Sequence, residues 1–308
     1  MTVAPPEKGE PWTVLRMIRW SAAYLEEKGV EGGRLDAEHL LAETLHTNRL
    51  GLYLEFDRPL IPVELSTYRE MLKRRGRREP LQYILGKAAF RELELEVDRR
   101  ALIPRPETEE LVGLVLAWAA EPENAPAARG WDVGTGSGAI ALALLDEGDF
   151  AAMVASDISQ DALDLAAANA RRCGVADRLE FRGGSLLDVL SEGERFDVLV
   201  ANLPYVPEGD RGEIAPEVRD WEPEQALFGG PEGMDAIDRL IAGAPTALRG
   251  GGLLALEVGA GQAENVRAII EASGDYRGVR VARDMADRDR FVLAETNLSD
   301  GPVKDGRG

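Results

Sequence analysis

The chain has 308 residues and a formal net charge of −19, from 36 basic and 55 acidic side chains, and so acidic a surface disfavours direct binding of nucleic acid. Its single cysteine excludes an intramolecular disulfide, and one cysteine with two histidines provides too few ligands for a zinc site, so no metal is expected. Because the sequence contains neither an apolar run of about 18 residues nor a signal-peptide pattern, we expect a cytoplasmic chain that does not contact a membrane.

The N-terminal quarter of the sequence is predicted to be helical. Residues 1–11 are rich in proline and glutamate, and we expect them to be disordered. A helical apolar spacing begins at Thr13, Asp36 is predicted to cap a second helix, and Pro62 is predicted to begin a third. Residues 12–85 are therefore expected to form a small helical bundle.

The periodicity changes after residue 85. Residues 90–97 alternate apolar and charged side chains, which predicts a strand, and we interpret residues 86–103 as a β-hairpin linker between two domains. From Gly130 onward strands and helices alternate, so residues 104–297 are predicted to form an α/β domain with a doubly wound, mainly parallel sheet. The polar tail, residues 298–308, is expected to be disordered.

A glycine-rich turn follows the first strand of this domain. Three glycines at alternate positions allow a tight turn and a close approach of a ligand to the backbone, and the helix that follows is expected to present free N–H groups to that ligand. The dinucleotide fingerprint has a different glycine spacing, G-x-G-x-x-G, and Ala139 stands where its third glycine would be. The glycines here have the spacing G-x-G-x-G, and an acidic residue precedes them in Asp132-Val133-Gly134-Thr135-Gly136-Ser137-Gly138. This pattern favours S-adenosylmethionine over NAD or FAD.

Two further positions are predicted to face the same cofactor. Asp157 ends the second strand, about twenty residues after the glycine turn, where a carboxylate can accept hydrogen bonds from both ribose hydroxyls. The loop after the third strand brings Ser185 and Leu186 to the same edge of the sheet, where they could contact the adenine.

The fourth strand ends in Asn202-Leu203-Pro204-Tyr205. A planar amide or amino nitrogen is a poor nucleophile, and two acceptors facing its N–H groups would fix its position. The Asn202 side-chain oxygen and the Leu203 backbone carbonyl are the candidates, Pro204 stiffens the turn, and Tyr205 offers a face for stacking. Aligning nitrogen, methyl and sulfur can then supply most of the catalysis without a strong base.

At this point the sequence resembles the bacterial peptide chain release factor glutamine methyltransferases, the PrmC/HemK family. The resemblance extends from about residue 13 to 296 and includes the glycine turn and the Asn202 tetrapeptide. Its other motifs are Arg78-Glu79-Pro80-Leu81-Gln82-Tyr83-Ile84-Leu85-Gly86, Leu102-Ile103-Pro104-Arg105-Pro106-Glu107-Thr108-Glu109, Trp221-Glu222-Pro223, Leu227-Phe228-Gly229-Gly230 and Glu257-Val258-Gly259.

The resemblance implies a class I, Rossmann-like methyltransferase domain behind a helical substrate-recognition domain. It implies N5-methylation of the glutamine in the Gly-Gly-Gln loop of a release factor, which modulates translation termination, by an enzyme that acts as a monomer. The implied catalytic and substrate contacts are Asn202, Leu203, Pro204 and Tyr205. The implied cofactor contacts are Gly134, Thr135, Gly136, Ser137, Gly138, Asp157, Leu186 and Asn202.

Two positions depart from the family pattern. The family usually has proline at the position of Leu203, and we expect activity to survive because a backbone carbonyl remains. The family often has an acidic residue at the position of Ser185, which weakens the prediction of an adenine contact there.

Two charged features have both structural and functional interpretations. Arg105 and Glu107 either clamp the substrate loop or form a structural ion pair. The basic residues in the segment 73–78 are either a solvated helix end or a docking surface for an acidic face of the release factor.

Three other functions remain open from the sequence. A related enzyme could methylate glutamine in a ribosomal protein, and a nucleic-acid amino-group methyltransferase uses a similar Asn-Pro-Pro-aromatic loop. A non-catalytic binding module could also retain this fold. The motif at residues 104–109 favours the release-factor branch, the acidic charge argues against nucleic acid, and the intact glycine and Asn202 loops argue against a binding module.

Overall fold

The computed structural model describes residues 10–124 and 128–297. The expected disorder of residues 1–9 and 298–308 lies outside the described residues. The chain divides into two compact units, of which one comprises residues up to Gly86 together with Ala215–Trp221, and the other comprises Lys87–Ile214 and the residues from Glu222 on. Within the expected domain of residues 104–297, the short segment 215–221 groups with the first unit.

The first unit is a helical bundle around an apolar core that includes Leu25, Leu40, Leu41 and Tyr68. Asp36 does not cap the second helix, which begins three residues earlier, at Gly33. Three of its helices were not predicted, because four to six residues are too few for a recognisable period. Its helices are α1 (Val14–Glu27), α2 (Gly33–Thr44), α3 (Arg49–Leu54), α4 (Pro62–Arg75), α5 (Leu81–Leu85) and the returning α9 (Pro216–Arg219).

The second unit begins with a β-hairpin of β1 (Lys87–Phe90) and β2 (Leu93–Glu96). The expected hairpin of residues 86–103 is therefore too long, because residues 97–105 form no strand. Asn169 holds the hairpin at residue 96: its Oδ1 accepts from the Glu96 backbone N–H at 2.8 Å and its Nδ2 donates to the Glu96 carbonyl at 3.0 Å.

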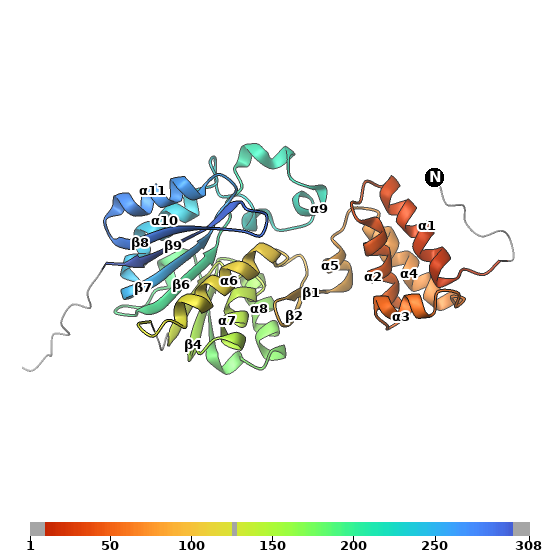
Figure 1. The fold of residues 1–308 in the computed structure, drawn as a ribbon, viewed down its shortest axis with the longest axis horizontal. Coiled ribbons are helices and arrows are strands. Elements are labelled where there is room, and N and C mark those ends of the chain that lie inside the picture. Colours follow the sequence, from red (N-terminus) through yellow and green to blue (C-terminus); the bar gives the residue numbers. More distant parts are fainter. Residues whose placement is uncertain (1–9, 125–127, 298–308) are drawn as a thin grey trace, which may run out of the picture. The chain divides into compact units, whose positions relative to one another are not determined.

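A seven-stranded sheet forms the centre of this unit, in the order β5-β4-β3-β6-β7-β9-β8 (Figure 1). The first five strands in this order are parallel, and β9 and β8 are antiparallel additions at one edge. Chain order reverses between β3 and β6, which is the point where ligands bind in open α/β sheets. The strands are β3 (Arg129–Val133), β4 (Ala152–Asp157), β5 (Leu179–Gly183), β6 (Phe196–Asn202), β7 (Leu248–Glu257), β8 (Tyr276–Arg283) and β9 (Asp289–Thr296).

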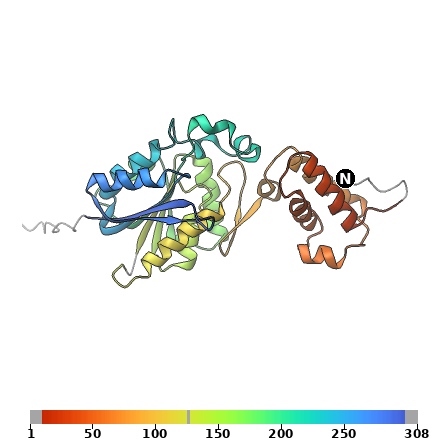
Figure 2. The same cartoon turned by 45° about the horizontal axis from the view of Figure 1, so that its top comes forward.

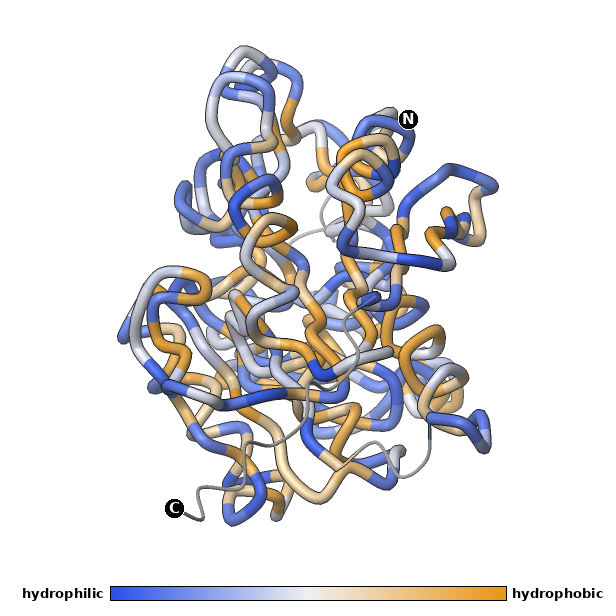
Figure 3. Tube along the Cα trace, turned by 90° about the vertical axis from the view of Figure 1, so that its left-hand side faces the viewer, coloured by the Kyte–Doolittle hydropathy of each residue, from blue (hydrophilic) through white to orange (hydrophobic). Residues whose placement is uncertain are grey.

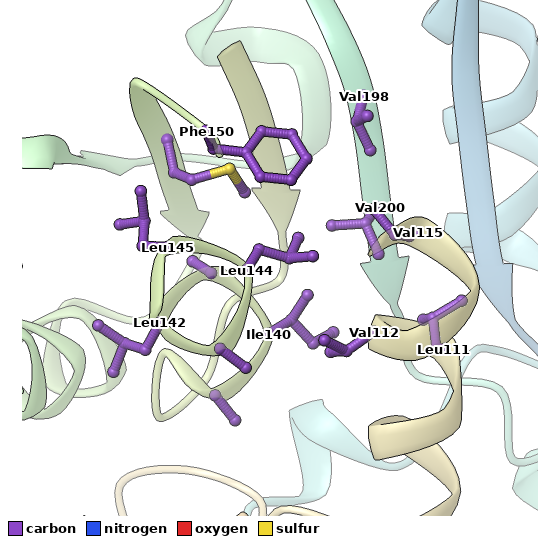
Figure 4. Packing of buried hydrophobic residues seen from close by; sticks show 14 of the residues in the cluster. Leu111, Val112, Val115, Ile140, Leu142, Leu144, Leu145, Phe150, Val198 and Val200 are labelled. Carbon is purple, nitrogen blue, oxygen red and sulfur yellow. The ribbon is translucent and has the colours of Figure 1, made fainter. Parts of the chain in front are cut away.

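Helices cover both faces of the sheet (Figure 2). On one face, α6 (Pro106–Ala119), α7 (Ala139–Glu147) and α8 (Gln160–Arg172) enclose one apolar cluster, in which residues of α6 and α7 pack toward Val198 and Val200 of β6 (Figure 4). On the other face, α10 (Asp235–Gly243) and α11 (Ala263–Ser273) enclose a second cluster. Hydrophobic and hydrophilic stretches alternate along the chain in Figure 3, as two-sided burial of a sheet requires. This packing fixes the carboxyl ends of the parallel strands, where the candidate site lies.

Candidate functional site

A cavity of about 230 Å³ opens at the carboxyl edge of the parallel strands. Its walls come from the segments that follow β3, β4, β5 and β6, and from the stretch Arg100–Arg105 before α6. All the expected cofactor positions except Gly138 line it, as do Arg105, Leu203 and Pro204. Glu107 and Tyr205 are not among the lining residues. The structure therefore brings together five segments that lie far apart in the sequence.

The glycine turn has a backbone that other residues would strain. Gly134 has φ +76° and Gly138 has φ +87°, both in the left-handed region. A Cβ at Gly134 would lie 3.0 Å from Cδ2 of Leu203, so the turn also packs closely against the Asn202 loop. Both conformation and space therefore require glycine at this position.

The backbone amides of the turn are largely used within the protein. Gly134 and Thr135 donate to the Ser156 carbonyl at 2.8 and 2.9 Å, and Gly136 donates to Oδ2 of Asp157 at 2.9 Å. These three amides are therefore not available to a ligand, and in the helix that follows, where free N–H groups were expected, the Ala141 amide donates to Asp132 Oδ2. A turn that keeps its amides for its own structure is suited to a cofactor without a pyrophosphate.

Asp132 is fully buried beneath the turn and had no assigned role in the sequence prediction. Its Oδ2 accepts from the Thr135 hydroxyl at 2.7 Å and from the Ala141 amide at 3.2 Å, so it ties the turn to the start of α7. Its Oδ1 has no hydrogen-bond partner among the described residues. Burial raises the pKa of Asp132 to about 7, although the two hydrogen bonds oppose this shift. Asp132 does not line the cavity, so its place in the site is to support the glycine turn from below.

Asp157 lines the cavity at the end of β4. Its Oδ2 accepts from Gly136 and its Oδ1 accepts from the Ser159 amide, each at 2.9 Å. Burial raises the pKa of Asp157, against these backbone hydrogen bonds. Each carboxylate oxygen can accept a further hydrogen bond, so the predicted ribose contacts are compatible with this arrangement.

Ser185 and Leu186 also line the cavity. Leu186 has φ +48°, a left-handed conformation that is uncommon for a residue with a side chain. Its side chain packs against the second apolar cluster, which holds it in this conformation. Such local strain is frequent at ligand sites.

The Asn202 side chain is held by a hydrogen-bonded chain that the sequence did not reveal. Asn202 Nδ2 donates to Thr108 Oγ1 at 3.1 Å, and the Thr108 hydroxyl donates to Glu257 Oε2 at 2.7 Å. Thr108 and Glu257 are buried, and both Thr108 and Asn202 line the cavity, whereas Glu257 does not. Burial raises the pKa of Glu257 to about 7, against the hydrogen bond from Thr108 and the charge of Arg290, which lower it.

The rest of the tetrapeptide is fixed by packing and by backbone contacts. The Leu203 side chain is 4% exposed and belongs to the second apolar cluster. The Tyr205 carbonyl accepts from Gln262 Nε2 at 3.0 Å, and the Arg290 guanidinium lies 5.9 Å from the centre of the Tyr205 ring. A Cβ at Gly229 would lie 2.3 Å from the Pro204 carbonyl oxygen, so the loop also depends on a glycine of a distant motif. The loop is therefore held without a proline at position 203.

Arg105 and Glu107 do not pair with each other, but each forms an ion pair with another residue. Arg105 donates to Glu222 Oε1 at 2.6 Å, and Glu222 Oε2 accepts from the Ile103 amide at 3.1 Å. Glu107 instead accepts from Arg288 at 3.2 Å and lies outside the cavity lining. The sequence predicted no role for Glu222, although it belongs to a motif of the family. In the structure it fixes the segment that forms one wall of the cavity.

The basic segment 73–78 is mostly neutralised inside the helical unit. Arg75 is buried and donates to Asp36 at 2.6 Å and to Glu217 at 3.1 Å. Arg78 pairs with Glu217, Arg74 with Glu79 and Lys73 with Glu70. The docking interpretation assumed free cationic side chains, and four of the five are engaged in ion pairs.

Among the residues that the structure describes, none of the helices has the length and apolar character that a membrane span requires. The same residues contain no group of three or more His, Cys, Asp or Glu side chains placed to hold a metal ion.

Two family models match the chain: "PrmC N-terminal domain" over residues 16–86 and "Methyltransferase domain" over residues 131–221. The release factor glutamine methyltransferase of Geobacter sulfurreducens is 43% identical over 287 residues, which cover 93% of this chain and 98% of that protein. The protein of the same name from Rhodopirellula baltica is 34% identical and covers 94% and 98%. The hMettl16 catalytic domain, solved with an RNA hairpin, has a TM-score of 0.54 at 15% identity over 67% of this chain and 76% of that one, which shows a shared Rossmann-like methyltransferase fold.

Proposed function

The chain belongs to the family of release factor glutamine methyltransferases, and we propose that it transfers a methyl group to the side-chain nitrogen (N5) of the glutamine in a release factor Gly-Gly-Gln loop. The cofactor is S-adenosylmethionine. When bound, it supplies a sulfonium methyl group, so that an N–C bond forms as the S–C bond breaks and the nitrogen releases one proton to water.

The observation that carries the proposal is the arrangement around Asn202. Its Nδ2 is engaged by Thr108, so its Oδ1 is the atom left to accept from an incoming N–H group. An amide NH₂ has two such groups, and the Leu203 backbone carbonyl is the second acceptor we propose. The two acceptors would fix the nitrogen and increase its electron density as the methyl group arrives. Pro204 and Tyr205 would position the flat amide beside them.

The proposed cofactor contacts follow the cavity walls. Gly134, Thr135, Gly136, Ser137 and Gly138 form the turn on which the cofactor would lie, and Asp157 would accept from the ribose hydroxyls. Leu186 would pack on the adenine. Arg105 lines the same cavity and is held by Glu222, so we propose that it orients the substrate loop, whereas Glu107, which lies outside the lining, has only a structural role in this proposal.

We propose that a release factor is the macromolecular partner and that the chain acts on it as a monomer in the cytoplasm. Two other substrates are weaker candidates. Ribosomal protein is the substrate of a related glutamine methyltransferase, but the relatives that match over more than 90% of this chain carry the release-factor name. Nucleic acid would have to approach a chain with a formal net charge of −19.

The test is a competition for label. The full chain is incubated with methyl-labelled cofactor and, in separate reactions, purified release factor, the same factor with the Gly-Gly-Gln glutamine changed to alanine, ribosomal proteins and tRNA. Label is expected only on the unaltered release factor. Label on ribosomal protein or tRNA alone would overturn the proposal.

Two variants of the chain accompany this assay. Asn202→Ala is expected to lower the rate at least about 100-fold, as removal of one preorganised hydrogen-bonding group in an active site commonly does. Asn124→Ala is the matched control, because Asn124 follows α6 and does not line the cavity. Its rate is expected to equal that of the unaltered chain.

A further inference from the structure

Three side chains from separate elements meet behind the reactive loop. Thr108 lies in the first turn of α6, Asn202 ends β6, and Glu257 ends the neighbouring strand β7, where the two are register partners. Their contacts are 3.1 Å between Asn202 Nδ2 and Thr108 Oγ1 and 2.7 Å between Thr108 Oγ1 and Glu257 Oε2. Thr108 is 4% exposed and Glu257 is 2% exposed, so little water reaches the hydrogen bond between these two side chains.

The chemistry of the three groups fixes which of them donates and which accepts in each hydrogen bond. An ionised carboxylate can only accept, so the single hydroxyl proton of Thr108 goes to Glu257. The Thr108 oxygen then has only lone pairs to offer to Asn202, and it selects the NH₂ end of the Asn202 amide. With the opposite orientation of that amide, two acceptor oxygens would face each other in a buried site. The Asn202 Oδ1 is thereby left on the side of the amide that faces away from Thr108.

We propose that Thr108 and Glu257 are positioning residues that keep Asn202 Oδ1 directed at the N–H groups of the substrate amide. This inference rests on the proposed function, because it assigns a reason for the orientation of Asn202 in that reaction. Neither residue needs to touch the substrate: Thr108 acts through Asn202, and Glu257 acts through Thr108.

The arrangement also selects the substrate by chemical class. Two acceptors at Asn202 and Leu203 suit a group that presents two N–H donors, such as a primary amide. A glutamate side chain in the same place would present carboxylate oxygens to these acceptors and would be repelled. A release factor with glutamate in place of the target glutamine is therefore expected neither to be methylated nor to compete with the unaltered factor.

The experiment compares Thr108→Val, which keeps the shape but removes the hydroxyl, with Thr108→Ser, which keeps the hydroxyl. With release factor as substrate, we expect kcat of Thr108→Val to fall about 10- to 100-fold, which corresponds to the loss of one buried hydrogen bond. Thr108→Ser should retain most of the rate, and the cofactor Kd should change little in either variant. In an Asn202→Ala background, Thr108→Val should have no additional effect, because Thr108 acts through Asn202.

Thr296→Val is the matched control. Thr296 is also a buried threonine, and its hydroxyl donates to the Arg249 carbonyl at a distance from the cavity. Its substitution should lower the melting temperature about as much as Thr108→Val does, without lowering kcat. If Thr108→Val retains the kcat of the unaltered chain, the inference is wrong. It is also wrong if Thr296→Val lowers kcat as much as Thr108→Val does.

A spectroscopic measurement separates this inference from the proposed function. In a chain labelled with ¹⁵N-asparagine, the Asn202 side-chain NH₂ signal is identified by its absence in Asn202→Ala. It should shift in Thr108→Val and return toward its original position in Thr108→Ser. An unaltered chain that methylates no release factor but shows this shift would refute only the proposed function. If the Asn202 NH₂ signal does not shift in Thr108→Val, the positioning role is refuted, whatever the substrate.

Discussion

The Arg78 guanidinium donates two hydrogen bonds of 2.6 Å to the carboxylate of Glu217, although 139 residues separate the two in the chain. Glu217 also accepts from the buried Arg75, which in turn pairs with Asp36. These contacts attach the segment Ala215–Trp221 to the helical unit, and the chain continues directly from that segment into Glu222, which holds Arg105 at the cavity wall. Two of the basic residues that suggested a docking surface, Arg75 and Arg78, therefore have a structural role.

Loss of the Glu217 carboxylate should destabilise the helical unit. Glu217→Gln leaves Arg75 and Arg78 with a weaker acceptor in a largely buried place, and we expect the free energy of unfolding to fall by about 1–3 kcal/mol. Chemical denaturation measures this change. Glu224→Gln, which breaks an exposed pair with Arg211, is the control and should change stability little. Equal effects of the two substitutions would show that the buried network is not special.

The periodicity of the sequence was sufficient to predict the alternation of strands and helices after Gly130 and the sheet edge at which Gly134, Asp157 and Asn202 meet, but not the two antiparallel strands β8 and β9. That inference works because the carboxyl ends of parallel strands share one edge, so the end of each strand identifies a site residue. The pairing of Glu217 with Arg78 could not be predicted, because no local pattern records which of many acidic residues faces a distant arginine. The chain from Asn202 to Glu257 was missed for the same reason: Thr108 and Glu257 stood in quoted motifs, but only the fold brings them into contact.

The pH dependence of transfer should report Glu257. Its pKa is raised to about 7 by burial, against Thr108, Arg290 and Arg105, which lower it, while Glu107 raises it further. Below this pH the protonated Glu257 carboxyl can donate to Thr108. The Thr108 hydroxyl is then free to donate to Asn202, so the orientation of the Asn202 amide is no longer fixed. We therefore expect kcat to rise with pH through about 7 and to level off above it.

The control for this profile is Glu257→Gln, which does not titrate. Asp132 also has a pKa raised to about 7, so part of the dependence can remain in the variant. The difference between the two profiles isolates Glu257. Identical profiles would contradict the assignment.

The buried Asp132 carboxylate should make the fold less stable as pH rises. Its folded pKa of about 7 lies above the ordinary value of 3.8, so the folded state binds the proton more tightly than the unfolded state does. The cost of burying the charge is absent below about pH 4, grows between about pH 4 and 7, and is complete above that range. Asp132→Asn removes the charge and keeps an acceptor for Thr135 and Ala141. The unfolding free energy of the variant relative to the unaltered chain should therefore increase from pH 5 to pH 8. A difference that does not vary with pH would show that Asp132 titrates normally.

Leu203 tests whether packing replaces the proline that the family usually has in the reactive loop. Its side chain is buried in the second apolar cluster and its Cδ2 approaches Gly134, so it packs the loop against the glycine turn. Leu203→Ala should cost about 2–4 kcal/mol of stability, as loss of a buried leucine side chain commonly does. Because the backbone carbonyl remains but its position is less fixed, kcat should fall more than the cofactor affinity. Leu203→Met conserves the volume and should cost less than about 1.5 kcal/mol, with kcat nearly unchanged. If Leu203→Ala loses stability but keeps the full kcat, the loop is positioned by its hydrogen bonds alone, through Asn202 and the Tyr205 carbonyl.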